Sequence, residues 1–402
     1  MTSELKDAPE NEEQVHRQNL VDSASPNPEP SGSTTNIDNC DLWSDADEDE
    51  LVKLDYDENF QVSGCSAEWS LECDKIVSEN GSPKNQFRPG YFIVSDFARQ
   101  QWCEMQLLYS FAPEIILMRV VPGEEVKIEE SEEAKAVKSK GTSIHLEREL
   151  EIQVPVPVVV KTKEDKWAVK LINLQQAVLA FCRGQRLARE IPVFGCPFGS
   201  DIFVYGIIDE LRYDPDKHDV HISELKTRKS FYSPKKGQQD KDKYQVNLYA
   251  QLFNELVAGK VSADMVASHL HLDLNKALGP GVLEHIQDVD TGISPDTCSF
   301  GELLEMVLSQ VQSLCCIRNS RVEYIHQDSK TEILVLEVTL DAEALQQQFL
   351  HHCEWWHGNR GTTGVDIEDC WKCEHCQFSP LCEWRDFMAN RLGNKKKAVS
   401  TG

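Results

Sequence analysis

The sequence lacks any long apolar run. No segment of the 402 residues is long and apolar enough to span a bilayer, and the N-terminal residues have no apolar core of the kind found in signal peptides. We therefore expect neither membrane insertion nor secretion. The chain has no Gly-x₄-Gly-Lys-Ser/Thr loop, which excludes a P-loop motor, and no internal repeat, which excludes a solenoid.

Positive charge is also scarce. The chain has 41 Lys and Arg against 67 Asp and Glu, a formal net charge of −26. Residues 1–60 hold 17 acids and 3 bases, a net of −14, which leaves −12 for the remainder. Because residues 1–85 are rich in Ser, Pro, Asn and Glu and poor in apolar residues, we expect a disordered acidic tail. Nucleic acid is not excluded as a partner, since binding depends on local basic patches.

Fourteen cysteines occur in a chain without a secretory signal, which favours thiols or metal ligands over disulfides. Four of them fall within thirteen residues near the end of the chain, and this density at Cys-x-x-Cys spacing is a strong metal signal. A structural zinc ion and an iron–sulfur cluster both take four such ligands, and the spacing does not choose between them. The four residues are Cys370, Cys373, Cys376 and Cys382.

A strand hairpin is predicted over residues 203–226, where β-forming residues flank the turn sequence 214–219. If the two ends of the turn face each other, Asp209 faces Glu224, with Cβ atoms about 4.5–5.5 Å apart. Lys226 then projects from the same face as Glu224. The arrangement fits a metal-dependent hydrolytic site, because two close carboxylates favour a cation such as Mg²⁺ and a lysine can neutralise developing charge. The alternative is an ordinary solvated hairpin.

A basic segment with interleaved aromatic residues follows the hairpin. Phosphate-neutralising charge beside aromatic rings suits single-stranded nucleic acid, although a solvated loop is the alternative. The basic residues are Arg228, Lys229, Lys235, Lys236, Lys241 and Lys243, and the aromatic residues are Phe231, Tyr232 and Tyr244.

Periodicity predicts the remaining elements. A helix over residues 95–110 contains Cys103, a helix over 141–151 carries His145 and Glu149 on one face, and Gln245 and Tyr249 lie one turn apart on a helix. The other predictions are helices over 165–185, 242–257, 301–315 and 341–356, a strand over 191–194, a second hairpin over 322–326 and 332–338, and a loop over 275–297.

Together these features resemble the RecB-type branch of the PD-(D/E)xK nucleases. The matching motifs are Gly206-x-x-Asp209, Glu224-x-Lys226 and Gln245-x₃-Tyr249. An upstream Cys103 followed by Cys373-x₂-Cys376-x₅-Cys382 resembles the iron–sulfur subset of that branch, and the lack of a helicase domain makes the chain most similar to the exonuclease V family. The resemblance covers residues 90–388, so we expect one nuclease domain at 86–390 and a basic flexible tail at 391–402.

The resemblance implies an α/β fold with a PD-(D/E)xK core, a mixed central sheet flanked by helices, closed by a [4Fe–4S] cluster that joins its N- and C-terminal parts. It implies a catalytic lysine, two residues that position DNA or this lysine, a site for Mg²⁺ or Mn²⁺, and four cluster ligands, with Cys370 left over. The implied catalytic lysine is Lys226, and the implied positioning residues are Gln245 and Tyr249. The implied metal ligands are Asp209, Glu224, His145 and, as a further acidic position, Glu190. The implied cluster ligands are Cys103, Cys373, Cys376 and Cys382.

The implied activity is a metal-dependent exonuclease that degrades single-stranded DNA to short oligonucleotides in DNA repair. Replication protein A is an expected partner, and we expect a monomer in the nucleus or also in the cytosol. Two alternatives stay open: a non-catalytic, metal-stapled protein that binds single-stranded nucleic acid, and an RNA nuclease.

Overall fold

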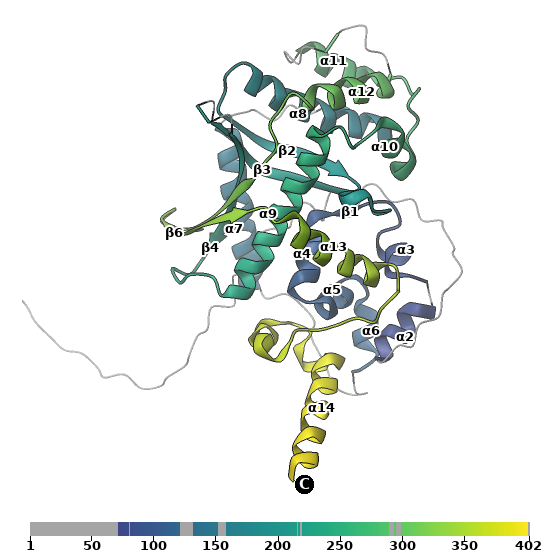
Figure 1. The fold of residues 1–402 in the computed structure, drawn as a ribbon, viewed down its shortest axis with the longest axis vertical. Coiled ribbons are helices and arrows are strands. Elements are labelled where there is room, and N and C mark those ends of the chain that lie inside the picture. The colour runs from purple at the N-terminus through teal and green to yellow at the C-terminus, as the bar shows by residue number, and fades with distance from the viewer. Residues whose placement is uncertain are drawn as a thin grey trace, which may run out of the picture. The chain divides into compact units, whose positions relative to one another are not determined.

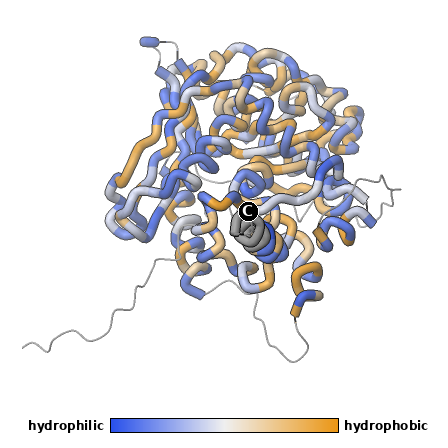
Figure 2. Tube along the Cα trace, turned by 60° about the horizontal axis from the view of Figure 1, so that its bottom comes forward, coloured by the Kyte–Doolittle hydropathy of each residue, from blue (hydrophilic) through white to orange (hydrophobic). Residues whose placement is uncertain are grey.

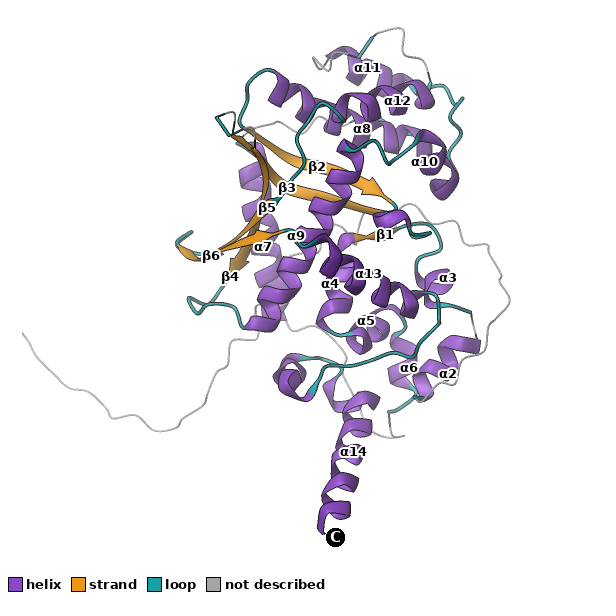
Figure 3. Cartoon of the chain, in the orientation of Figure 1, coloured by secondary structure: helices purple, strands orange, loops and turns teal. Residues whose placement is uncertain are grey.

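A six-stranded mixed sheet organises the structure (Figures 1 and 3). The computed structural model describes residues 71–79, 81–120, 132–151, 158–214, 216–217, 219–288, 293–294 and 299–400. All of them belong to one compact unit, residues 38–402. The predicted mixed α/β architecture with flanking helices is confirmed. The strands are β1 (Phe92–Ile93), β2 (Leu187–Gly195), β3 (Val204–Asp214), β4 (Asp219–Arg228), β5 (Asn319–His326) and β6 (Glu332–Thr339).

Strand β3 has different neighbours on its two edges. Strand β2 pairs antiparallel with it from one end to the other. On the opposite edge, β1 pairs parallel with Val204 and Tyr205, and β4 pairs antiparallel with Leu211 to Asp214. Between these two partners, the ladder on that edge is interrupted. Strand β4 turns away from β3 and continues as a parallel partner of β5, which pairs antiparallel with β6.

The predicted register of the β3–β4 hairpin is confirmed where the two strands pair. Asp214 faces Asp219, and Leu211 faces Ile222. The prediction extended the ladder too far, because Asp209 and Glu224 are not a ladder pair. The strands separate beyond Leu211 and Ile222, since the parallel ladder with β5 holds β4 from Ile222 onward.

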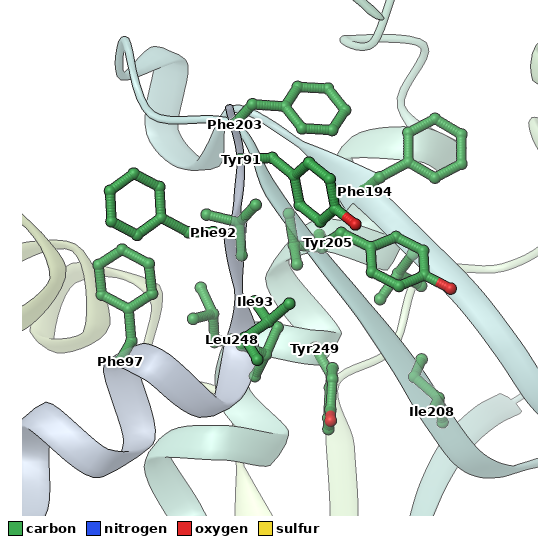
Figure 4. Packing of buried hydrophobic residues seen from close by; sticks show 14 of the residues in the cluster. Tyr91, Phe92, Ile93, Phe97, Phe194, Phe203, Tyr205, Ile208, Leu248 and Tyr249 are labelled. Carbon is green, nitrogen blue, oxygen red and sulfur yellow. The ribbon is translucent and has the colours of Figure 1, made fainter. Parts of the chain in front are cut away.

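Helices α8 and α9 carry the main packing against the sheet. Helix α8 (Lys163–Cys182) begins at a capping box between Thr162 and Asp165 and packs on β2. Helix α9 (Lys236–Val257) packs on β2, β5 and helix α4, and its buried residues include Leu248 and Tyr249. Figure 4 shows these two side chains beside the aromatic residues of β1 and β3.

The other predicted helices are present with shifted ends, and two predictions were wrong. The single helix over 95–110 is broken at Cys103 into two helices. The loop over 275–297 contains a helix, α11. The bounds are α4 (Val94–Trp102), α5 (Glu104–Phe111), α6 (Pro113–Leu117), α7 (Glu132–Leu150), α10 (Ala263–Leu270), α11 (Pro280–Asp288), α12 (Phe300–Val311) and α13 (Ala342–Trp356).

Ordered structure begins earlier than the predicted boundary at residue 86. Helices α2 (Glu72–Glu79) and α3 (Pro83–Phe87) precede it, and Cys73, Asp74 and Val77 of α2 are buried. Residues 1–70 lie outside the described residues. At the other end, helix α14 (Glu383–Ser400) runs through most of the predicted flexible tail. Three short 3₁₀ segments complete the fold: η1 (Pro197–Gly199), η2 (Ile367–His375) and η3 (Ser379–Leu381).

Apolar residues occur in short runs along many elements, as Figure 2 shows. Among the helices that the structure describes, none is long and apolar enough to cross a membrane.

Candidate active site and cysteine pocket

Asp209 lies on the stretch of β3 where the ladder toward β4 is interrupted. Its carboxylate occupies this split, because its Oδ2 accepts a hydrogen bond of 3.1 Å from the backbone N–H of Leu225 on β4. The side chain therefore takes the place of a backbone partner between the two strands. It is partly open to solvent, with 23% of its surface exposed.

Glu190 lies across from Asp209 on the other edge of β3. The β2–β3 register pairs Arg189 with Glu210 and Ile191 with Ile208, and it skips the Glu190–Asp209 position between them. Glu190 has a φ of 53°, a left-handed conformation that costs a non-glycine residue roughly 1–3 kcal/mol and is concentrated at functional sites. Glu190, the irregular position of β2, therefore lies beside Asp209, which the sequence analysis predicts as a metal ligand.

Glu224 and Lys226 point from the same face of β4, as the alternation of strand residues predicts. Lys226 Nζ lies 3.1 Å from Glu224 Oε1, and their side chains are only 7% and 3% exposed. Burial of both groups requires such pairing, because an isolated charge in a low-dielectric interior is costly. The predicted catalytic lysine is therefore held at the carboxylate beside the split.

Helix α7 brings His145 to the same place. Its Nδ1 lies 3.5 Å from Asp209 Oδ2. The helix buries only Gly141 and Ile144 and is otherwise attached by polar contacts, such as the 2.6 Å ion pair between Lys330 and Glu147. The structure thus brings Asp209 and His145 into contact from segments more than sixty residues apart.

Gln245 and Tyr249 lie beneath β3, where Figure 4 places Tyr249. Gln245 Nε2 donates a hydrogen bond of 3.2 Å to the Tyr249 hydroxyl, and both side chains are buried. A Cβ on Gly206 would lie 2.6 Å from Tyr249 Cε1 and 2.7 Å from Val94 Cγ2. Only glycine allows this approach, so the Gly-x-x-Asp motif has a packing cause. Gln245 Oε1 is buried and has no hydrogen-bond partner among the described residues.

The carboxylate oxygens of this site are the donor type that Mg²⁺ prefers. In the described part of the chain, however, no three His, Cys, Asp or Glu side chains are arranged to hold one metal ion. The site's residues fit a divalent cation in chemical type and in their gathering at one split between strands. Their assignment as Mg²⁺ ligands stays a prediction.

The sequence analysis did not identify the polar residues that lie next to Lys226 on the neighbouring strand and on α9. Tyr324 on β5 is the ladder partner of Lys226, and its hydroxyl donates a hydrogen bond of 2.6 Å to Asp242 Oδ2. Burial and the negative charge of Asp242 raise the pKa of Tyr324, so the phenol remains a neutral donor. Gln238 Nε2 also donates to Asp242, at 3.1 Å. Alternation along the predicted strand could have placed Tyr324 inward, but no signal identified its partner.

The four predicted cluster cysteines line one pocket, although about 270 residues separate Cys103 from the others. Cys103 reaches the pocket because the chain is extended there, with φ −170° and ψ 114°, between helices α4 and α5. Cys373 lies in η2, Cys376 follows it, and Cys382 follows η3. Other lining residues include Trp102, Tyr109, Val365, Lys372, Phe378 and Trp384.

Burial, with a smaller contribution from the neighbouring Cys376 and Cys382, raises the pKa of Cys103 to about 12. Burial likewise raises the pKa of Cys376 to about 11. A metal centre deprotonates coordinating thiols, so a set of buried, mutually close thiols fits such a centre in chemistry. The described thiols are not spaced as ligands of one metal ion, and the choice of cluster stays a prediction. Cys370 is exposed, and it is absent from the residues that line this pocket.

The basic segment is only partly as predicted. Lys235 and Lys236 are exposed at the start of α9, and Lys235 Nζ lies 4.2 Å from the ring centroid of Trp371. Arg228 and Lys241 are buried, so neither belongs to an exposed basic surface, and Lys243 pairs with Asp240 at 3.7 Å. The remaining basic residue is Lys229, which contacts Glu133 of α7.

One of the three interleaved aromatic residues was misassigned. Tyr244 is buried, and its hydroxyl oxygen lies 3.1 Å from His352 Nδ1. Its ring therefore cannot serve as an exposed stacking platform. Phe231 and Tyr232 remain exposed.

Comparison with known proteins decides the family. The chain matches the model described as "Exonuclease V - a 5' deoxyribonuclease" over residues 82–219, 215–302 and 299–385. The chain belongs to the exonuclease V family. Exonuclease V of Danio rerio is 34% identical over 314 residues, which are 77% of this chain and 75% of that protein. The predicted membership in the exonuclease V family is thereby confirmed.

The likeness to solved structures is weaker. The structure described as "Crystal structure of SSO0001" covers 75% of this chain and 93% of its own chain, at 13% identity and a TM-score of 0.33. It carries no argument about function. Membership in the exonuclease V family supports a nuclease that hydrolyses phosphodiester bonds.

Proposed function

We propose that this chain is a 5′ exonuclease that hydrolyses single-stranded DNA with Mg²⁺ or Mn²⁺ and releases short oligonucleotides. The observation that carries the proposal is the gathering of Asp209, Glu224 and Lys226 at the β3–β4 split in a member of the exonuclease V family. The 5′ polarity is taken from the description of the family. Single-strand specificity and the metal follow from the sequence motifs and the resemblance.

Asp209, Glu224 and His145 would hold the cation, and Glu190 is a further acidic candidate beside Asp209. A bound divalent cation supplies Lewis-acid stabilisation of the phosphoryl group and an activated water. Lys226, fixed by Glu224, places a positive charge where negative charge develops on the phosphate. Tyr324, the ladder partner of Lys226 on β5, is held in position by its hydrogen bond to Asp242. Gln245 and Tyr249 support β3 from below.

The proposal is tested with end-labelled single-stranded DNA and the variants Asp209→Asn and Lys226→Ala. We expect each to lower the cleavage rate at least about 100-fold, the scale of a lost positioned charge or acid–base group. Asp264→Asn is the control, because Asp264 is an exposed first-turn acid of α10. Undiminished cleavage by both site variants would rule out the assignment. Faster cleavage of RNA of the same sequence would favour the RNA nuclease, and binding without any product would favour the non-catalytic alternative.

We further propose that Cys103, Cys373, Cys376 and Cys382 hold a [4Fe–4S] cluster. The support is their convergence on one pocket from opposite ends of the domain. The visible spectrum and the iron and zinc content of freshly purified protein test this assignment: zinc at one equivalent without iron would contradict it. Interaction with replication protein A, a monomeric state, nuclear localisation and a role in DNA repair stay predictions of the resemblance.

A further inference from the structure

Two large aromatic side chains stand exposed in the segment between β4 and α9. Phe231 is 62% exposed and Tyr232 is 81% exposed. They follow Lys226 by five and six residues, so the Cα of Phe231 lies at most about 18 Å from that of the proposed catalytic lysine. Exposed aromatic residues in a loop beside a catalytic site indicate a binding surface more often than a packing requirement.

Phe231 is held in a fixed orientation by His326. The two rings are stacked with centroids 3.7 Å apart and an angle of 13° between their planes. His326 is itself anchored at both ring nitrogens: Nε2 lies 2.8 Å from the carbonyl oxygen of Lys229, and Nδ1 accepts a hydrogen bond from the backbone N–H of Ser329. One face of the Phe231 ring is therefore covered, while most of the side chain remains exposed to solvent.

The charges around this ring indicate the class of ligand. Lys235 and Lys236 are exposed a few residues further along the same segment, in a chain whose total charge is strongly negative. A flat ring backed by a second ring, beside cations, is the arrangement on which single-stranded nucleic acids stack their bases while their phosphates are neutralised. A paired base in a duplex could not offer its face to such a ring without leaving its stack.

We propose that Phe231, backed by His326, is a stacking platform for an unpaired nucleobase, and that Tyr232 extends this platform. The inference rests on the proposed function, since it assumes that a single strand enters the site at this loop. It adds to that function the residue that discriminates an unpaired base from a bare phosphate backbone.

The test measures equilibrium binding of the full-length protein to fluorescein-labelled oligothymidylate of 20 nucleotides, in chelator so that no cleavage occurs. The same length of abasic backbone has the same phosphates and no bases. We expect Phe231→Ala to weaken oligothymidylate binding about five- to tenfold, the lower end of the effect of one lost stacking ring, and to change abasic binding less than twofold. Phe231→Tyr keeps the ring and should restore binding.

Leu350→Ala is the matched control, because Leu350 is a large exposed apolar residue, 47% exposed, on helix α13. It should change neither affinity. The inference is overturned if Phe231→Ala leaves oligothymidylate binding unchanged, if it weakens both ligands equally, or if the wild-type protein does not prefer bases to the abasic backbone. Cleavage by the wild-type protein in Mg²⁺ is measured separately: absence of cleavage would contradict the proposed function, whereas a base-selective defect in Phe231→Ala would still support the platform.

Discussion

The buried ion pair between Arg88 and Asp96 gives the sharpest stability prediction. Arg88 Nε donates to Asp96 Oδ2 and Arg88 Nη2 donates to Asp96 Oδ1, both at 2.7 Å, and the Asp96 side chain is fully buried. Asp96 also accepts a hydrogen bond from the backbone N–H of Ile93 at the start of helix α4. This helix ends at Cys103 and packs on α9, so the pair secures the element that delivers a cysteine to the pocket.

Asp96→Asn removes the negative charge and keeps the shape of the side chain. Breaking one partner of a buried ion pair costs about 3–5 kcal/mol, because the other charge is left buried. Asparagine can still accept the hydrogen bond from Ile93, so we expect a value near the lower end, about 3 kcal/mol. That value corresponds to a decrease of roughly 100-fold in the ratio of folded to unfolded protein.

The measurement is urea denaturation followed by circular dichroism. Asp264→Asn is again the control, because it removes an exposed first-turn carboxylate from another helix, and we expect it to change the free energy of unfolding by less than about 0.5 kcal/mol. Arg88→Met completes a double-mutant cycle, in which the double variant should lose less than the sum of the two single changes. Equal stability of Asp96→Asn and Asp264→Asn would refute the reasoning.

Two further predictions concern the proposed metal and cluster sites. Glu190→Gly should relieve the left-handed backbone strain at this position and raise the free energy of unfolding by about 0.5–1 kcal/mol. The same variant should lower the rate of Mg²⁺-dependent cleavage. A variant that loses stability and keeps full activity would contradict a functional role for the strain. Cys103→Ser should lose visible colour, iron, solubility and single-strand binding together, whereas Cys370→Ser should retain them; a fully coloured and active Cys103→Ser would exclude it from the ligand set.

The fold could be predicted where local patterns and tertiary contacts agree. The turn between β3 and β4 fixes the register that places Asp214 opposite Asp219, and turn composition is visible in the sequence. The point where the strands separate could not be predicted, because it depends on the parallel ladder with β5, about a hundred residues further along the chain. The split matters most for function, since it determines where the Asp209 carboxylate lies.

Two local errors have a similar cause. Cys103 looked like a position inside one helix, yet it adopts an extended conformation that starts a second helix. Tyr244 looked like part of an exposed basic and aromatic surface, yet it is buried against His352 of α13. In both cases the surroundings of the residue come from distant segments, residues 364–385 for Cys103 and α13 for Tyr244, and a single sequence contains no record of them.

The same long-range contacts connect the cysteine pocket to the proposed DNA-binding segment. Trp371 of η2 contacts Trp102 edge to face, with ring centroids 5.5 Å apart, and Lys235 Nζ lies over the Trp371 ring. A Cβ on Gly237, in the first turn of α9, would lie 2.7 Å from Lys372 Cε, so the helix packs directly on η2.

A centre that joins position 103 to position 373 would close a loop of about 270 residues, which constrains the unfolded chain by roughly 5 kcal/mol as an upper value. Loss of that link would free η2 to move away from the start of α9, which carries Lys235 and Lys236. The proposed cluster can therefore control strand binding through packing alone, without taking part in the proposed hydrolysis at Asp209 and Glu224.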